Sequence, residues 1–168
     1  MIAYWSAAVT LWIAMILLSA AVAGARAPRA VAGDIDAYRV LPDGAGRWFA
    51  PVLVLVQMLA ALLILIPATR VAGAVLTVLL LGLFIAAIAL NIRRGTTDFG
   101  CGCAGPHHIR PGAPLLLRNA VLFFAALAVA VSPVSPYDVW HCAVACLLFL
   151  GWLFVNAMIA ASQWPRDD

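Results

Sequence analysis

The sequence predicts an all-α integral membrane protein, a compact bundle of four to five transmembrane helices. Two observations predict this class: of the 168 residues 66% are hydrophobic and only 10% are charged, and the apolar residues gather into five long runs. A typical soluble domain is about 45–50% apolar and about 25% charged. A water-soluble globule is therefore excluded, and the lipid bilayer is the expected partner of most of the surface.

The first three runs are predicted to cross the membrane, because a spanning helix needs about 20 mostly apolar residues. Residues 2–23 hold neither Arg nor Asp, although Ala21-Val22-Ala23 also imitates the cleavage site of a signal peptide. Residues 49–66 contain one polar interruption, Gln57. Residues 71–92 again lack Arg and Asp. Gly82 and Ala86 are small residues four positions apart, a spacing that weakly predicts a close contact with another helix.

The remaining two runs complete a single membrane domain over residues 1–168. Residues 115–131 carry Arg118 and Asn119 near their start, so this run is either a short span or a re-entrant segment. Residues 139–161 are long enough to span and hold neither Arg nor Asp. The helix count therefore stays at four or five.

Charge between the runs predicts the orientation. The ten basic residues are all Arg and the seven acidic ones are all Asp. Residues 24–48 and 93–118 each hold four Arg, and if all five runs span, only Arg70 lies on the opposite side. The positive-inside rule then places both long loops and the C-terminus in the cytoplasm and the N-terminus outside, in a multi-pass protein of the inner (plasma) membrane. A net charge of +3 spread over loops offers no face for nucleic acid.

The segment between the third and fourth runs holds two of the four cysteines. Cys101 and Cys103 are separated by Gly102, and glycine permits the tight turn that a small disulfide ring requires. Strained or exposed disulfides tend to exchange, and nearby cations favour the reactive thiolate. The pattern predicts a dithiol redox site, with these cationic neighbours: Arg93, Arg94 and, when protonated, His107 and His108.

Two other interpretations of this segment stay open. Cys101, Cys103, His107 and His108 are soft or borderline ligands and could bind zinc or copper. Adjacent histidines and a one-residue cysteine gap make a cramped tetrahedron, so we expect no metal. The second alternative is a glycine-rich loop with two unreactive thiols.

Cys142 and Cys146 lie one turn apart in the last run. Their β-carbons should be about 5–6 Å apart, whereas a disulfide needs about 3.5–4.5 Å, so they should not bond to each other. We expect both to pack inside the bundle as small hydrophobes. A relay of electrons from them to Cys101 and Cys103 is the alternative. No soluble-cofactor motif is present, and a quinone is compatible with the chain but supported by no motif.

A set of residues between about Asp34 and Asn119 forms a recognisable pattern. Its marks are Ala37-Tyr38-Arg39-Val40-Leu41-Pro42, Asn91, Arg93-Arg94-Gly95, Asp98, Cys101-Gly102-Cys103, Gly105 and Arg118-Asn119. With these marks the chain resembles the MauE family of membrane proteins, which is related to the DoxX-like, redox-associated proteins.

The resemblance implies a DoxX-like helical bundle and a role in maturing a partner protein. The family's namesakes serve methylamine utilisation, in which methylamine dehydrogenase needs many disulfides and matures alongside a thioredoxin-like protein. The resemblance also makes Asp98 and Gly105 supporting residues of the dithiol. This chain departs from the family pattern at three positions, with Gln57 for a glutamate, Gly100 for an acid and Ala104 for an aromatic residue.

The resulting hypothesis is a membrane thiol-redox protein whose Cys101 and Cys103 exchange electrons with a thioredoxin-like partner and assist a maturing exported protein. If it is an enzyme, it is a thiol–disulfide oxidoreductase. One rival is a non-enzymatic docking subunit or chaperone of a maturation complex. The other is a small transporter or metal-handling protein, which the lack of charge within the long runs disfavours. The side of the membrane is a point of conflict, because exported proteins mature outside the cytoplasm.

Overall fold

The fold is all-helical in a computed structural model that describes residues 2–42, 44–95, 112–133 and 136–162. Five helices in this part of the chain are long and apolar enough to cross a membrane, which confirms a multi-pass membrane protein. The weak fourth run is one continuous helix of 19 residues. The helices are α1 (Ile2–Arg26), α2 (Pro28–Ala37), α3 (Gly46–Leu65), α4 (Arg70–Arg94), α5 (Ala113–Val131) and α6 (Val139–Ser162).

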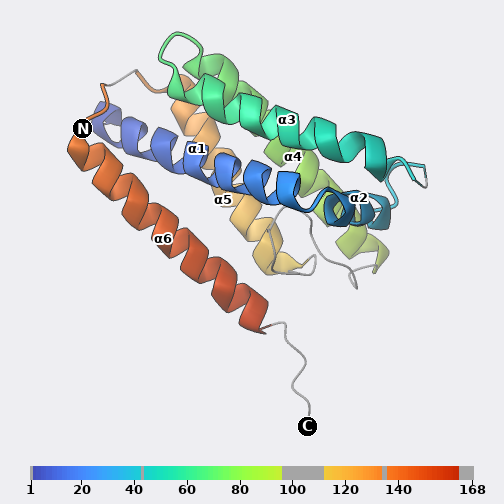
Figure 1. The fold of residues 1–168 in the computed structure, drawn as a ribbon. Coiled ribbons are helices and arrows are strands. Elements are labelled where there is room, and N and C mark those ends of the chain that lie inside the picture. Colours follow the sequence, from blue (N-terminus) through green and yellow to red (C-terminus); the bar gives the residue numbers. More distant parts are fainter. Residues whose placement is uncertain (1, 43, 96–111, 134–135, 163–168) are drawn as a thin grey trace.

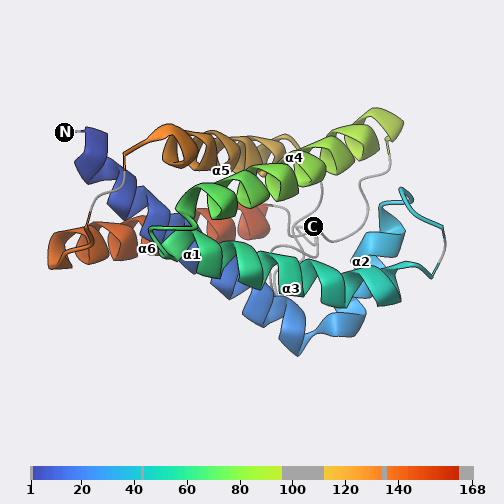
Figure 2. The same ribbon diagram turned by 90° about the horizontal axis from the view of Figure 1, so that it is seen from above.

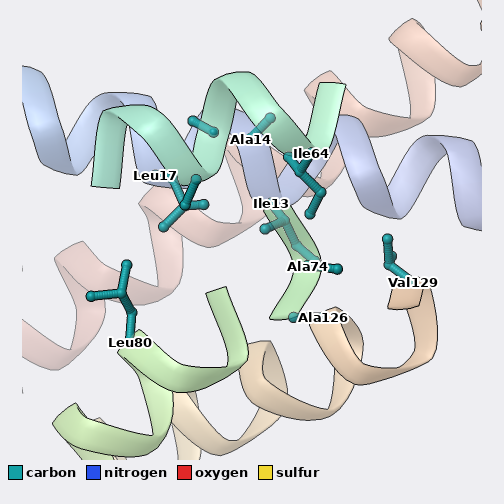
Figure 3. Packing of buried hydrophobic residues seen from close by; sticks show 10 residues of the cluster. Ile13, Ala14, Leu17, Ile64, Ala74, Leu80, Ala126 and Val129 are labelled. Carbon is teal, nitrogen blue, oxygen red and sulfur yellow. The ribbon is translucent and has the colours of Figure 1, made fainter. Parts of the chain in front are cut away.

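Four helices form the body of the bundle. α3 packs between α1 and α4, and α4 packs along α5 (Figures 1 and 2). Their main apolar core, seen in Figure 3, lies toward the end where α3 turns into α4. Many of its residues are alanines, which let helix backbones approach closely. The buried members are Ile13, Ala14, Leu17, Ala60, Ala61, Ile64, Ala74, Leu80, Ala126 and Val129.

Arg70 closes this end of the bundle. Its side chain is only 2% exposed. The guanidinium donates hydrogen bonds to the carbonyl oxygens of Val129 (2.8 Å), Ser132 and Pro133 (3.2 Å). These carbonyls lie at or just beyond the last turn of α5, where carbonyl groups lack helical partners and attract a cation. Arg70 thus joins the start of α4 to the end of α5.

The short helix α2 was not expected from the sequence. It begins with Pro28, whose fixed φ and missing N–H suit the first turn of a helix. It lies against the start of α3 (Figure 1). There the Gly46 N–H donates to the Asp36 carboxylate at 2.8 Å. A β-carbon at Gly46 would lie 2.1 Å from the Ala32 carbonyl oxygen, so this close approach requires glycine.

The last helix, α6, packs mainly along α1 and is the most exposed of the five long helices. In its most apolar stretch 11% of the residues are buried, against 50% for α1. Cys142 and Cys146 are free and exposed on this helix. The expectation that they pack inside the bundle is therefore wrong: α6 is covered on one side only, and both thiols lie on the uncovered part.

Candidate functional site

The predicted redox segment is held between the ends of α4 and α5. α4 ends at Arg94 and is capped by Gly95, which adopts a left-handed φ of 70° and whose N–H donates to the carbonyl of Ile92 at 3.1 Å. α5 begins after Gly112. The predicted site residues between them lie outside the described residues: Asp98, Cys101, Gly102, Cys103, Gly105, His107 and His108. Arg93 and Arg94 form the exposed last turn of α4.

Two groups of family marks meet beside this junction. The amide nitrogen of Asn91, which is 1% exposed, donates to the carbonyls of Tyr38 at 3.2 Å and Ala87 at 2.9 Å. Arg94 donates to the carbonyl of Arg39 at 3.4 Å. Arg39 has a φ of 48°, which costs energy for a residue other than glycine. The residues after α2 are therefore fixed against the end of α4.

Apolar packing completes the junction. Ile88 of α4 and Leu115 of α5 are both fully buried, and Tyr38 packs against them. Ile159 and Ala160, near the end of α6, join the same cluster. The two ends of the redox segment therefore leave from helices whose relative position is fixed by packing.

A cavity of about 500 Å³ lies within the bundle, and we name it the polar cavity for the buried polar side chains in its wall. Its walls come from α1, α3, α4, α5 and α6, and they are mostly apolar. Among them are five buried polar side chains inside otherwise apolar helices: Gln57, Thr77, Arg118, Asn119 and Asn156. Polar side chains at membrane depth are costly and are typically functional.

Arg118 joins two walls of the polar cavity. It is 8% exposed and donates a hydrogen bond from Nη1 to the side-chain oxygen of Asn156 on α6. Its guanidinium carbon lies 5.2 Å from the centre of the Trp152 ring, a cation–π arrangement. The amide nitrogen of Asn156 donates in turn to the Trp152 carbonyl at 2.7 Å. One cationic side chain therefore positions both residues of α6.

Two buried amides line the polar cavity. Asn119 is 3% exposed, and its Nδ2 has no hydrogen-bond partner among the residues that the structure describes. Gln57 is 5% exposed and lines the same cavity. Buried polar groups in proteins are nearly always paired, so an amide left over beside a cavity suits a bound molecule.

The sequence identified parts of this site without assembling it. Arg118 and Asn119 were recognised as family marks, and Gln57 as a polar interruption. The cavity that unites them with Thr77 and Asn156 was missed. The available signal was the presence of polar residues in apolar runs, but these helices are apolar all round, and periodicity does not show which positions face one another.

The comparisons with known proteins agree with these marks. The family model described as Methylamine utilisation protein MauE matches residues 2–132. A Methylamine utilization protein MauE from Paracoccus denitrificans is 37% identical over 124 residues, which cover 73% of this chain and 67% of the relative. The protein of that name from Methylophilus methylotrophus is 30% identical over 135 residues, covering 75% of this chain and 70% of the relative. No solved structure is significantly similar. The chain therefore belongs to the MauE family of membrane proteins.

Proposed function

We propose that this chain is an inner-membrane component of methylamine utilisation that assists the maturation of an exported partner protein. In this proposal Cys101 and Cys103 carry out thiol–disulfide exchange with a thioredoxin-like protein. The observation that carries the proposal is family membership over residues 2–132, a range that contains both thiols. The packed junction of α2, α4 and α5 supports it, because a reactive segment works best when it starts and ends on rigid elements.

The proposed exchange proceeds in two steps. A thiolate of this chain attacks the disulfide of the partner, the partner's S–S bond breaks, and a mixed disulfide forms while the other partner sulfur leaves as a thiolate. The second cysteine then attacks the mixed disulfide, which releases the reduced partner and joins Cys101 to Cys103. Two electrons pass to the partner, and the reverse sequence returns them. Arg93 and Arg94 place positive charge at the start of the segment, which favours a thiolate.

The test measures the thiol state in membranes with a mass-shifting alkylating reagent. We expect Cys101 and Cys103 to be protected under oxidising conditions and released by dithiothreitol. Replacing one by serine should trap or abolish a mixed disulfide, and the double variant should fail to restore growth on methylamine to a host that lacks its own MauE protein. Cys142→Ser and Cys146→Ser are the matched controls, since both thiols lie exposed on α6.

A non-enzymatic docking subunit is the second candidate, favoured by α2. This helix lies outside the five spans, and Arg29 and Gly33 are exposed on it. It therefore offers a partner in a maturation complex an exposed surface that carries the charge of Arg29. If both thiols stay reduced under oxidising conditions and the double serine variant still supports growth, docking replaces redox exchange as the function.

A further inference from the structure

We propose that the polar cavity between α1, α3, α4, α5 and α6 is a binding site for a quinone, a membrane-soluble ring whose two oxygens alternate between carbonyl and hydroxyl. The binding proposal stands on the cavity alone. Its role as the electron partner of the dithiol rests on the proposed function.

The position of the cavity among the five long helices favours a ligand that dissolves in the membrane. Its residues lie within the five long helices, from Ile13 to Ala23 on α1 and from Trp152 to Ala157 on α6. Apolar side chains make up most of the wall, as in other small-molecule sites. A volume of about 500 Å³ is within the range of roughly 300–1,000 Å³ that holds a small organic molecule.

The polar groups suit an oxygen that changes its hydrogen-bonding role. The Asn119 and Gln57 amides each carry both a donor and an acceptor. They can donate to a quinone carbonyl and accept from the hydroxyl of a hydroquinone, whichever way each amide is turned. Asn119 is more than nine-tenths buried, and its Nδ2 has no hydrogen-bond partner in the described part of the chain. An oxygen of the ligand would supply the missing acceptor.

Aromatic side chains suit a flat ring. Phe84 and Trp152 both line the cavity. Trp152 is held from one side by the Trp12 ring, in an edge-to-face contact with centres 5.9 Å apart. It is also held by the Arg118 guanidinium. Offset ring stacking on a side chain fixed in this way adds attraction beyond the burial of apolar area.

The electron balance of the coupled reaction is complete with a quinone. Two cysteine thiols lose two protons and two electrons and form one S–S bond. The quinone gains the same two electrons and two protons and becomes a hydroquinone. A dithiol that has been reduced by a partner protein would be reoxidised in this way without any further reactant.

The test measures binding of decylubiquinone to the full chain in lipid nanodiscs by quenching of tryptophan fluorescence. We expect saturable quenching. Asn119→Leu and Gln57→Leu should each raise the dissociation constant about tenfold, the effect of one lost hydrogen bond. Thr10→Val is the matched control, because Thr10 is also fully buried and polar but does not line the cavity. It should bind as the unaltered chain does.

A ligand control separates a quinone site from a lipid-filled groove. Decylbenzene carries a similar tail and ring without oxygens, and we expect it neither to quench nor to compete. Competition by decylbenzene, quenching without saturation, or equal binding by Asn119→Leu, Gln57→Leu and Thr10→Val would each overturn the proposal.

The double variant Cys101→Ser with Cys103→Ser distinguishes the two proposals. It should bind decylubiquinone with an unchanged dissociation constant. In the unaltered chain, saturable binding without thiol exchange would remove the proposed function alone. Thiol exchange without saturable binding would remove the quinone site alone.

Discussion

Arg70 and Arg118 are both buried in the bundle, and their charges are used differently. Arg70 is 2% exposed, and the hydrogen bonds described for it all run to backbone carbonyls at the end of α5. Arg118 bonds to a side chain, stacks on Trp152 and lines the polar cavity. The hydrogen bonds of Arg70 therefore hold the fold together. Beside Arg118, by contrast, the amide nitrogen of Asn119 has no partner in the described part of the chain and is available to a ligand.

Arg70→Leu should therefore destabilise the bundle by about 3 kcal/mol, since it leaves several buried carbonyls without a donor. The measurement is thermal or denaturant unfolding of the purified protein in detergent. Arg47→Leu is the matched control, because Arg47 is exposed and contacts only the neighbouring Trp48 ring within the described residues. Equal stability of the two variants would contradict the bracing role of Arg70.

At the scale of elements, the five long helices were predictable and their contacts were not. Length and hydropathy alone identify a candidate span, and each of the five runs is a helix long and apolar enough to cross, including residues 115–131, for which the sequence left a re-entrant segment open. α2 was missed because it is short and mixes polar with apolar residues, and its stability comes from packing on α3. Contacts between spans depend on helix rotation, which an apolar surface does not reveal.

Two glycines of α4 show that the contacts between helices could not be predicted from the sequence. The weak spacing of Gly82 with Ala86 suggested one close contact, but a β-carbon at Gly82 would meet Phe123 at 3.6 Å, an ordinary distance. The close approach is at Gly73 on α4, where a β-carbon would lie 2.3 Å from the backbone nitrogen of Ile64 on α3. Glycine is therefore required at Gly73 and replaceable at Gly82.

Gly73→Ala should lower the free energy of unfolding by about 1–3 kcal/mol, because the methyl group forces α3 and α4 apart. Gly82→Ala is the control and should be neutral or stabilising, since alanine is the better helix former by about 1 kcal/mol. Unfolding in detergent compares the two. A Gly73→Ala protein as stable as the Gly82→Ala protein would show that the two helices can separate without cost.

At the scale of the whole molecule, the two ends of the bundle differ. The Arg70 brace lies at the end where α3 turns into α4, and the junction of α2, α4 and α5 lies at the other. The polar cavity lies between them and shares Ile13 and Leu17 with the alanine-rich core. The sequence could predict the thiols and their charged neighbours, because these are local in the chain. The cavity was unpredictable, since its polar residues are contributed by four helices that only the tertiary fold brings together.

The orientation of the bundle in the membrane matters for the proposed function, because the side of the membrane on which Cys103 lies decides which partner proteins can reach it. The positive-inside rule predicts the cytoplasmic side. Single-cysteine proteins test this in spheroplasts with a membrane-impermeant maleimide, after Cys101, Cys142 and Cys146 are replaced by alanine. Cys103 should react only after lysis. A cysteine introduced as Ala68→Cys, in the exposed turn between α3 and α4, should react in intact spheroplasts.

The opposite pattern would place the redox segment outside, beside exported proteins, and would show that packing had overridden the arginine bias. Arg70 does not favour this outcome. Its guanidinium is hydrogen-bonded to backbone carbonyls inside the fold, so it adds little to the charge count on its own side, and the bias of the two long loops stands. Labelling of both positions in intact spheroplasts would instead contradict the crossing of α4, because the two positions lie beyond opposite ends of that helix. The paired reporters therefore test the orientation and the crossing of α4 in one experiment.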